Sequence, residues 1–119
     1  MSKMAMTING AKADNIFPAI TLAVSAAATG DEVIIYFTPG GAPILVKGAM
    51  EKLNEETANM PDLMEMMEGL KMLGARLLMC ELALEANGIK EEDLMEEVEV
   101  VGATTFVGAA DGAGLTFSF

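Results

Sequence analysis

Cys80 is the only cysteine in the chain and its best candidate for nucleophilic chemistry. It follows the apolar run 76–79 and begins a helical pattern over 80–86, so we expect it at a helix N-terminus. Unpaired N–H groups there carry partial positive charge that favours a thiolate, whereas Glu81 and Glu85 oppose it by like-charge repulsion. Because the chain contains no histidine, Cys–His chemistry with an imidazole base is excluded.

Two kinds of thiol chemistry need no imidazole. One is sulfur transfer through a persulfide, and the other is redox sensing. The alternative is an inert, buried Cys80, because free cysteine is among the most buried residue types. From its position alone, packing explains Cys80 better than chemistry does.

Glycines with Thr or Asn follow several of the expected strands and form a second group of candidates. Backbone N–H groups in such loops suit a small anion, although turn chemistry explains these glycines about as well. Neither GxGxxG nor GxxxxGK[ST] is present, and we expect no cofactor. The candidate anion-binding residues are Asn9, Gly10, Thr38, Gly40, Gly41 and Gly102.

Two further chemistries find little support. Met60, Met64 and Met67 recur at helical spacing and could hold Cu(I), but packing explains them better, so we expect no metal. The many carboxylates include no pair at a strand end in the apolar setting that glycoside hydrolysis needs.

The elements that must position these residues alternate between strands and helices. This alternation predicts a mainly parallel sheet with helices on both faces, whose ligands gather beyond the carboxyl ends of the strands. We expect strands at 4–8, 32–37, 76–79, 98–101 and 115–119, helices at 13–30, 42–53, 61–73, 80–86 and 102–110, and one or two helical turns at 91–97.

Length and composition predict one domain over residues 1–119 that contacts other subunits. Apolar residues make up 52% of the 119 residues, more than one small core can hide. We therefore expect a homo-oligomer.

The net charge of −11 limits the partners. Nucleic acid and anionic membrane surfaces are disfavoured because Lys and Arg do not cluster. The segment 1–10 lacks a signal-peptide core, and the most apolar run, 16–28, is too short to span a bilayer. We expect a soluble, cytoplasmic protein.

Three stretches resemble the DsrE/DsrF-like family, in particular its "peroxiredoxin-like" DsrE branch. They are "DEVIIYFT" with the turn after it, "LKMLGARLLMCELALEANGIKEEDL", and "VEVVGATTFVGAA". The middle stretch is the most specific, because Cys, Gly-Ile and an acidic turn recur in that order. Together with the Ala-rich segment before them, these stretches cover roughly residues 13–110.

The resemblance implies a small three-layer α/β domain with a five-stranded parallel sheet that assembles into dimers, trimers or larger oligomers. In sulfur-relay members of the family, a cysteine after the third strand carries sulfane sulfur as a persulfide and exchanges it with a small carrier protein of the TusA type. By position that cysteine corresponds to Cys80. Pro39-Gly40-Gly41 replaces the aromatic residues that the branch often has after strand two, which implies a more open pocket.

The leading hypothesis is therefore a sulfur carrier or persulfide-based sulfurtransferase that uses Cys80, with backbone N–H groups near Cys80, Gly40 and Gly102 stabilising the anion. The first alternative is an oligomeric binding or assembly module that holds a small anion or nucleotide in the glycine-rich loops. The second is a redox sensor that forms an intermolecular Cys80 disulfide.

Overall fold

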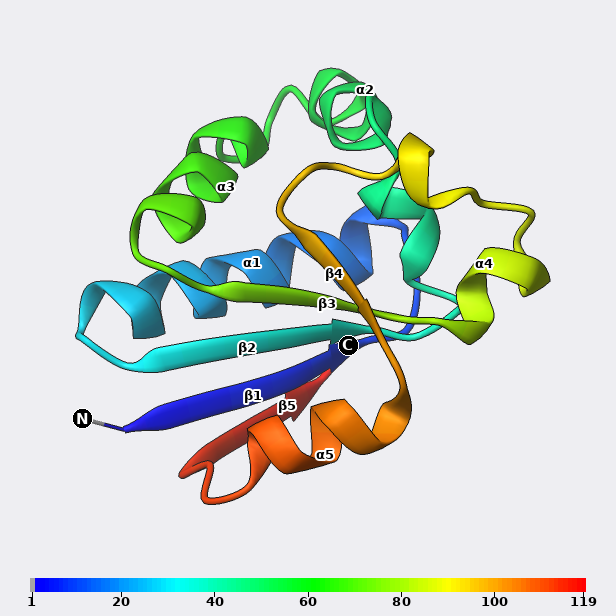
Figure 1. Ribbon diagram of the computed structural model, residues 1–119. Coiled ribbons are helices and arrows are strands. Elements are labelled where there is room, and N and C mark those ends of the chain that lie inside the picture. The colour runs from blue at the N-terminus through cyan, green and yellow to red at the C-terminus, as the bar shows by residue number, and fades with distance from the viewer. Residues whose placement is uncertain (1) are drawn as a thin grey trace.

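The computed structural model describes residues 2–119 and contains a five-stranded sheet in which every strand is parallel to its neighbours (Figure 1). The strand order is β4-β3-β2-β1-β5. The mainly parallel sheet predicted from the sequence is thereby confirmed, and all five carboxyl ends lie at one edge. The strands are β1 (Lys3–Ile8), β2 (Glu32–Phe37), β3 (Arg76–Cys80), β4 (Val98–Val101) and β5 (Leu115–Ser118).

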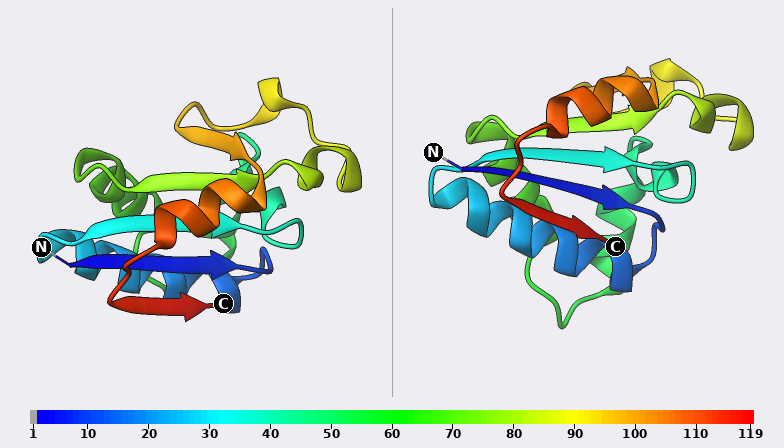
Figure 2. Two further views of the ribbon diagram at one scale, coloured as in Figure 1. Left: turned by 60° about the horizontal axis from the view of Figure 1, so that its bottom comes forward. Right: turned by 90° about the horizontal axis from the view of Figure 1, so that it is seen from below.

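Helices cover both faces of the sheet, as predicted. The helices α1 and α3 lie on one face and α5 on the other (Figures 1 and 2). In the part of the chain that the structure describes, α5 is the only helix on its face. The helices are α1 (Ala13–Ala28), α2 (Ala49–Glu56), α3 (Leu63–Met72), α4 (Leu82–Ala86) and α5 (Ala103–Ala110), with 3₁₀ turns η1 (Ala42–Leu45) and η2 (Glu91–Asp93).

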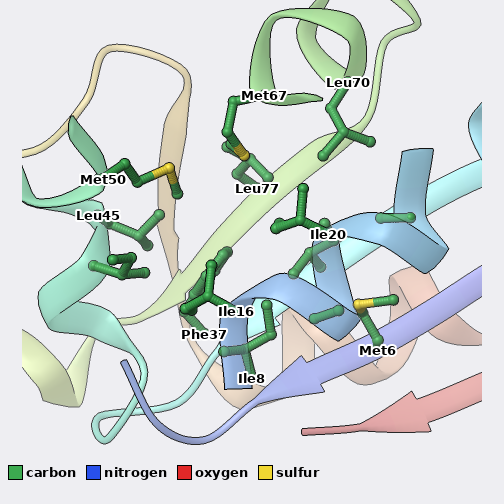
Figure 3. Close-up of a cluster of buried hydrophobic side chains, with 14 of the residues drawn as sticks. Met6, Ile8, Ile16, Ile20, Phe37, Leu45, Met50, Met67, Leu70 and Leu77 are labelled. Atoms are coloured by element: carbon green, nitrogen blue, oxygen red, sulfur yellow. The ribbon is translucent and has the colours of Figure 1, made fainter. Parts of the chain in front are cut away.

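The main hydrophobic core lies between the sheet and the α1–α3 layer (Figure 3). Alternate residues of β1 face it, because side chains of a strand point to opposite faces in turn. From α1, Ile16, Ile20 and Ala23 reach the same core at helical spacing, and all three are fully buried. The apolar periodicity of this segment therefore anchors α1 to the sheet.

The helix expected over 42–53 is in fact two elements. The turn η1 ends at Leu45, and Val46 is extended and forms an antiparallel bridge with Leu94. Gly48 then adopts φ +90°, a left-handed conformation that a helix cannot contain, before α2 begins. A contact with a distant segment thus overrides the local helical pattern.

The position expected for Cys80 also needs correction. Cys80 is the last residue of β3 and pairs with Val101 of β4, and does not begin a helix. The Glu81 N–H group continues the ladder by donating to the Val101 carbonyl at 2.9 Å. The helix α4 starts only at Leu82 and has five residues. Helix-dipole stabilisation of the thiolate by α4 therefore finds no support in the geometry.

Candidate functional site

Cys80 lies at the carboxyl end of β3, on the sheet face that α5 covers. It belongs to a second apolar cluster, separate from the main core and formed by Ile34, Tyr36, Leu78 and Cys80. Val101, Phe106 and Ala109 pack against this cluster. The residue is 7% exposed and lies at the carboxyl edge of the sheet.

Tyr36 is the polar neighbour of Cys80 inside this cluster. Its ring stacks on Phe106 of α5 with a centroid distance of 4.6 Å and an interplanar angle of 10°. Burial, followed by hydrogen bonding and charge from Cys80 and by the charge of Glu81, raises the pKa of Tyr36 to about 12. The phenol therefore keeps its proton at every pH where a thiol normally reacts, and a protonated phenol can donate a hydrogen bond.

Gly102 lies beside Cys80, because its chain neighbour Val101 is the β4 partner of Cys80. It is the N-cap of α5 and has no side-chain cap. A Cβ atom on residue 102 would lie 3.4 Å from Glu81 Oε1, so a carboxylate already stands next to this helix start. Negative charge from Glu81 would repel an anion that approached the N–H groups of α5 here.

Asn9 and Thr38 form a second polar group at the same edge, beyond β1 and β2. Thr38 Oγ1 donates to Asn9 Oδ1 at 3.0 Å, and Asn9 Nδ2 donates to Ser118 Oγ at 2.8 Å. The hydroxyls of Thr7 and Ser118 are hydrogen-bonded at 2.7 Å. These side chains therefore hold β1, β5 and the loop after β2 together.

Gly40 and Gly41 sit where the loop after β2 crosses the end of β1. A Cβ atom on Gly40 would collide with the Asn9 carbonyl oxygen, and one on Gly41 with the Ile8 carbonyl oxygen. The Gly41 N–H group donates to the Thr38 carbonyl at 2.9 Å. Close backbone packing accounts for both glycines, and anion binding by them stays a prediction.

The residues predicted as one site thus fall into three places. Cys80 and Gly102 lie together under the α5 face, and Asn9, Thr38, Gly40 and Gly41 form the polar loop group. Gly10 packs against the Asn15 side chain at the start of α1, where a Cβ atom would collide with Asn15 Oδ1. Whether any of these residues binds an anion stays a prediction.

Sequence reasoning missed Tyr36 and Phe106. The signal for Tyr36 was present, because in "DEVIIYFT" it stands at even spacing from Ile34 near the end of a strand. Nothing in the sequence indicated that β2 and β3 are neighbours or that Phe106 would reach the same cluster.

The described residues, 2–119, contain neither a candidate metal site nor a membrane-spanning helix. No group of three or more Cys, Asp or Glu side chains within that range is arranged to hold a metal ion. No helix in the same range combines the length and apolar character needed to cross a bilayer.

The sequence matches the DsrE/DsrF-like family over residues 2–119. An uncharacterized protein of Methanocaldococcus jannaschii is 30% identical over 73 residues, which cover 61% of this chain and 26% of that protein. The chain therefore spans about a quarter of the length of this curated relative.

Two solved structures share the fold. The ychN protein of E. coli is 16% identical, with a TM-score of 0.78 over 100% of both chains. MTH1491 of Methanobacterium thermoautotrophicum, a protein of unknown function, is 17% identical, with a TM-score of 0.73 over 98% of this chain and 97% of its own.

Proposed function

Because the chain belongs to the DsrE/DsrF-like family, we propose that it is a sulfur carrier that holds sulfane sulfur as a persulfide on Cys80. The observation that carries the proposal is the place of Cys80, the last residue of β3, at the carboxyl edge of the sheet beside a protonated phenol. Ligands and chemistry gather at this edge in open parallel sheets.

The proposed chemistry needs no external oxidant. In loading, the Cys80 thiolate attacks the outer sulfur of a donor persulfide or polysulfide, a new S–S bond forms, and the donor thiolate leaves with the electron pair of the broken S–S bond. In delivery, a partner thiolate attacks the outer sulfur of the Cys80 persulfide, and the Cys80 thiolate leaves. The partner proposed here is a small carrier protein of the TusA type.

Access to the sulfur depends on α5. This helix has no fully buried residue, and its C-terminal end is tied to the sheet by Lys3 Nζ, which donates to the carbonyls of Ala109 and Asp111 at 3.0 and 2.8 Å. Displacement of α5 would break the two Lys3 hydrogen bonds, and it would uncover Cys80 while the main core on the other face stays packed.

A homo-oligomer is the second part of the proposal. A groove of about 370 Å³ runs along the flank of α5 over β1 and β5, and its lining residues carry no charge. Val107 of α5 is 66% exposed. Parallel sheets are normally covered on both faces, and in a chain of net charge −11 an uncharged face is the one that a second copy can approach. The lining residues are Ala5, Met6, Thr7, Phe106, Ala110, Thr116, Phe117 and Ser118.

Sedimentation of the wild type and of Val107→Glu and Thr116→Glu variants tests this assembly. We expect an oligomer for the wild type and smaller species for both variants. Glu51→Gln, an exposed substitution on α2, is the matched control and should leave the oligomer intact. A monomeric wild type at micromolar concentration would contradict the assembly.

The binding-module alternative draws less support from the geometry. A ligand at the polar loop group would have to break the bonds that Asn9 and Thr38 make with their neighbours. Such bonds are replaced only at a cost of about 1 kcal/mol each.

Intact-protein mass spectrometry tests the sulfur-carrier proposal directly. The wild-type protein is incubated with polysulfide or thiosulfate beside Cys80→Ala. We expect a mass gain of one or more sulfur atoms that a reductant removes and that the variant lacks. A wild type that gains no sulfur from either donor, and whose thiol is also silent to alkylation, would make Cys80 a packing residue.

A further inference from the structure

The strand register brings Tyr36 and Cys80 together across β2 and β3. Tyr36 pairs with Leu78, which lies two residues before Cys80, so all three side chains share the face under α5. Tyr36 is 6% exposed, and its ring is clamped against Phe106. A buried phenol needs a polar partner, because an unpaired polar group away from water is costly.

Among the four buried residues of this cluster, only Cys80 offers another side-chain atom that can take part in a hydrogen bond, its sulfur. Among the causes that raise the pKa of Tyr36, burial comes first and hydrogen bonding to the Cys80 side chain second. A phenol that keeps its proton can donate a hydrogen bond and a thiolate can only accept one, so a bond between the two must run from the hydroxyl to the sulfur. The strand register and the shared cluster place the two side chains on one face, where such a bond can form.

We propose, on the premise of the sulfur-carrier function, that Tyr36 is a positioning residue whose hydroxyl donates a hydrogen bond to the Cys80 sulfur whenever that sulfur is anionic. The anionic forms are the thiolate that attacks the donor and the thiolate that leaves when sulfur is delivered. Tyr36 keeps its proton throughout, so the bond stabilises charge without transferring a proton. This donor fills the role that a helix N-terminus was expected to play.

The other charged groups on this face do not stabilise an anionic Cys80 sulfur as Tyr36 does. Glu81, next in the chain, opposes the anion by like-charge repulsion, and α5 carries no titratable side chain. Lys3, Glu32 and Arg76 each begin a strand, away from Cys80. Glu99 lies level with Leu78 and Tyr36 across β4, β3 and β2, where Arg76 holds its carboxylate in an ion pair.

The first test compares Tyr36→Phe with Phe106→Leu by the pH dependence of iodoacetamide alkylation. Tyr36→Phe keeps the ring stack and removes only the hydroxyl, whereas Phe106→Leu removes the stack and keeps the hydroxyl. We expect Tyr36→Phe to alkylate about tenfold more slowly near neutral pH, with its profile displaced toward higher pH, as the loss of about 1.4 kcal/mol of hydrogen bonding to a charged group implies. Superimposable profiles for Tyr36→Phe and the wild type would overturn the proposal.

The second test measures the interaction between Tyr36 and Cys80 through the titration of the Tyr36 phenol. Tyr36 is the only tyrosine, and the chain has no tryptophan, so the ultraviolet absorbance of tyrosinate reports this residue alone. Because coupling between two sites is reciprocal, Cys80→Ala should lower the titration midpoint of Tyr36 below the wild-type value. An unchanged midpoint would show that burial alone perturbs the phenol and would overturn the proposal.

Measurements of sulfur loading distinguish a failure of the Tyr36 role from a failure of the sulfur-carrier function. If Tyr36→Phe loads sulfur from polysulfide as fast as the wild type at every pH, the positioning role fails while the carrier function stands. If the wild type does not load at all, the carrier function fails, and the alkylation and titration results still decide whether Tyr36 acts on the thiol. Thermal unfolding of Tyr36→Phe verifies that the variant is folded.

Discussion

The two faces of the sheet are built in opposite ways. On one face, α1 and α3 close a continuous core in which side chains such as Ile20 and Phe37 are fully buried (Figure 3). On the other face, α5 is the one helix among the described residues that lies over a cluster of four buried residues, and none of its own residues is fully buried (Figure 2). Cys80, the only cysteine, lies on the face that α5 covers.

The α1–α3 face supplies most of the buried core, whereas the α5 face holds the candidate reactive thiol. A thick, close-packed layer resists local opening, whereas a helix with few buried contacts opens at a lower free energy. In the proposed function Cys80 must be reached by a second protein, and the α5 face holds this residue under a helix that has no buried residue of its own. Four measurements test this difference between the two faces.

The largest effect is expected from a matched pair of phenylalanines on opposite faces. Phe37→Ala empties a fully buried position in the main core, where such truncations cost about 3–5 kcal/mol of unfolding free energy. Phe106→Ala, at a half-buried position on α5, should cost about half as much. Denaturant unfolding measures both. Equal losses would contradict the difference between the faces.

Alkaline pH should weaken the α5 face through Tyr36. The folded pKa of about 12 lies above the ordinary value of 10.0, so the folded protein retains a proton that the unfolded chain loses. Stability from this group is complete below about pH 10 and declines as the pH rises toward 12, by at most about 2–3 kcal/mol. Unfolding free energies of the wild type and Tyr36→Phe should diverge in this window, and parallel curves would contradict the assignment.

Two glycines test the backbone contact at the edge that both faces share. Gly41→Ala forces a Cβ atom against the Ile8 carbonyl oxygen and should cost about 2 kcal/mol or more. Gly69→Ala in α3 meets no atom within 4 Å and should stabilise the helix by roughly 0.5–1 kcal/mol. Thermal unfolding distinguishes the two, and a neutral Gly41→Ala would show that the loop after β2 can move away.

The smallest effect concerns the Arg76–Glu99 ion pair, which joins β3 to β4 on the α5 face. Arg76 Nη2 lies 2.8 Å from Glu99 Oε1, and both side chains are about two-fifths exposed. The Arg76 guanidinium lowers the pKa of Glu99, so the pair contributes above the ordinary pKa of a glutamate and is lost on acidification. Because solvent screens it, Glu99→Gln should cost about 0.2–1 kcal/mol at neutral pH and nothing in acid. A larger loss that persists in acid would point to packing.

The sequence was sufficient where local pattern decides the outcome. The β-branched run 32–37 and the short apolar run 76–79 predicted β2 and β3, and their alternation with helical segments predicted the parallel sheet. The absence of histidine and the single Cys80 narrowed the chemistry to a thiol that acts without an imidazole base. The structural inferences are confirmed because strand and helix periodicities are properties of neighbouring residues, whereas the thiol chemistry stays a prediction.

Only the tertiary structure decided what surrounds Cys80. Strand order made β2 and β3 neighbours and so placed Tyr36 by the sulfur, and the path of α5 brought Phe106 against that phenol. The bridge between Val46 and Leu94 broke a helix that the local pattern favoured, and pairing with Val101 kept Cys80 in a strand. Each of these outcomes depends on contacts between residues far apart in the chain. The free energy of such contacts cannot be inferred from a local sequence pattern. The sequence determined which residue is the candidate nucleophile, and the packing of the sheet determined which side chains surround and cover it.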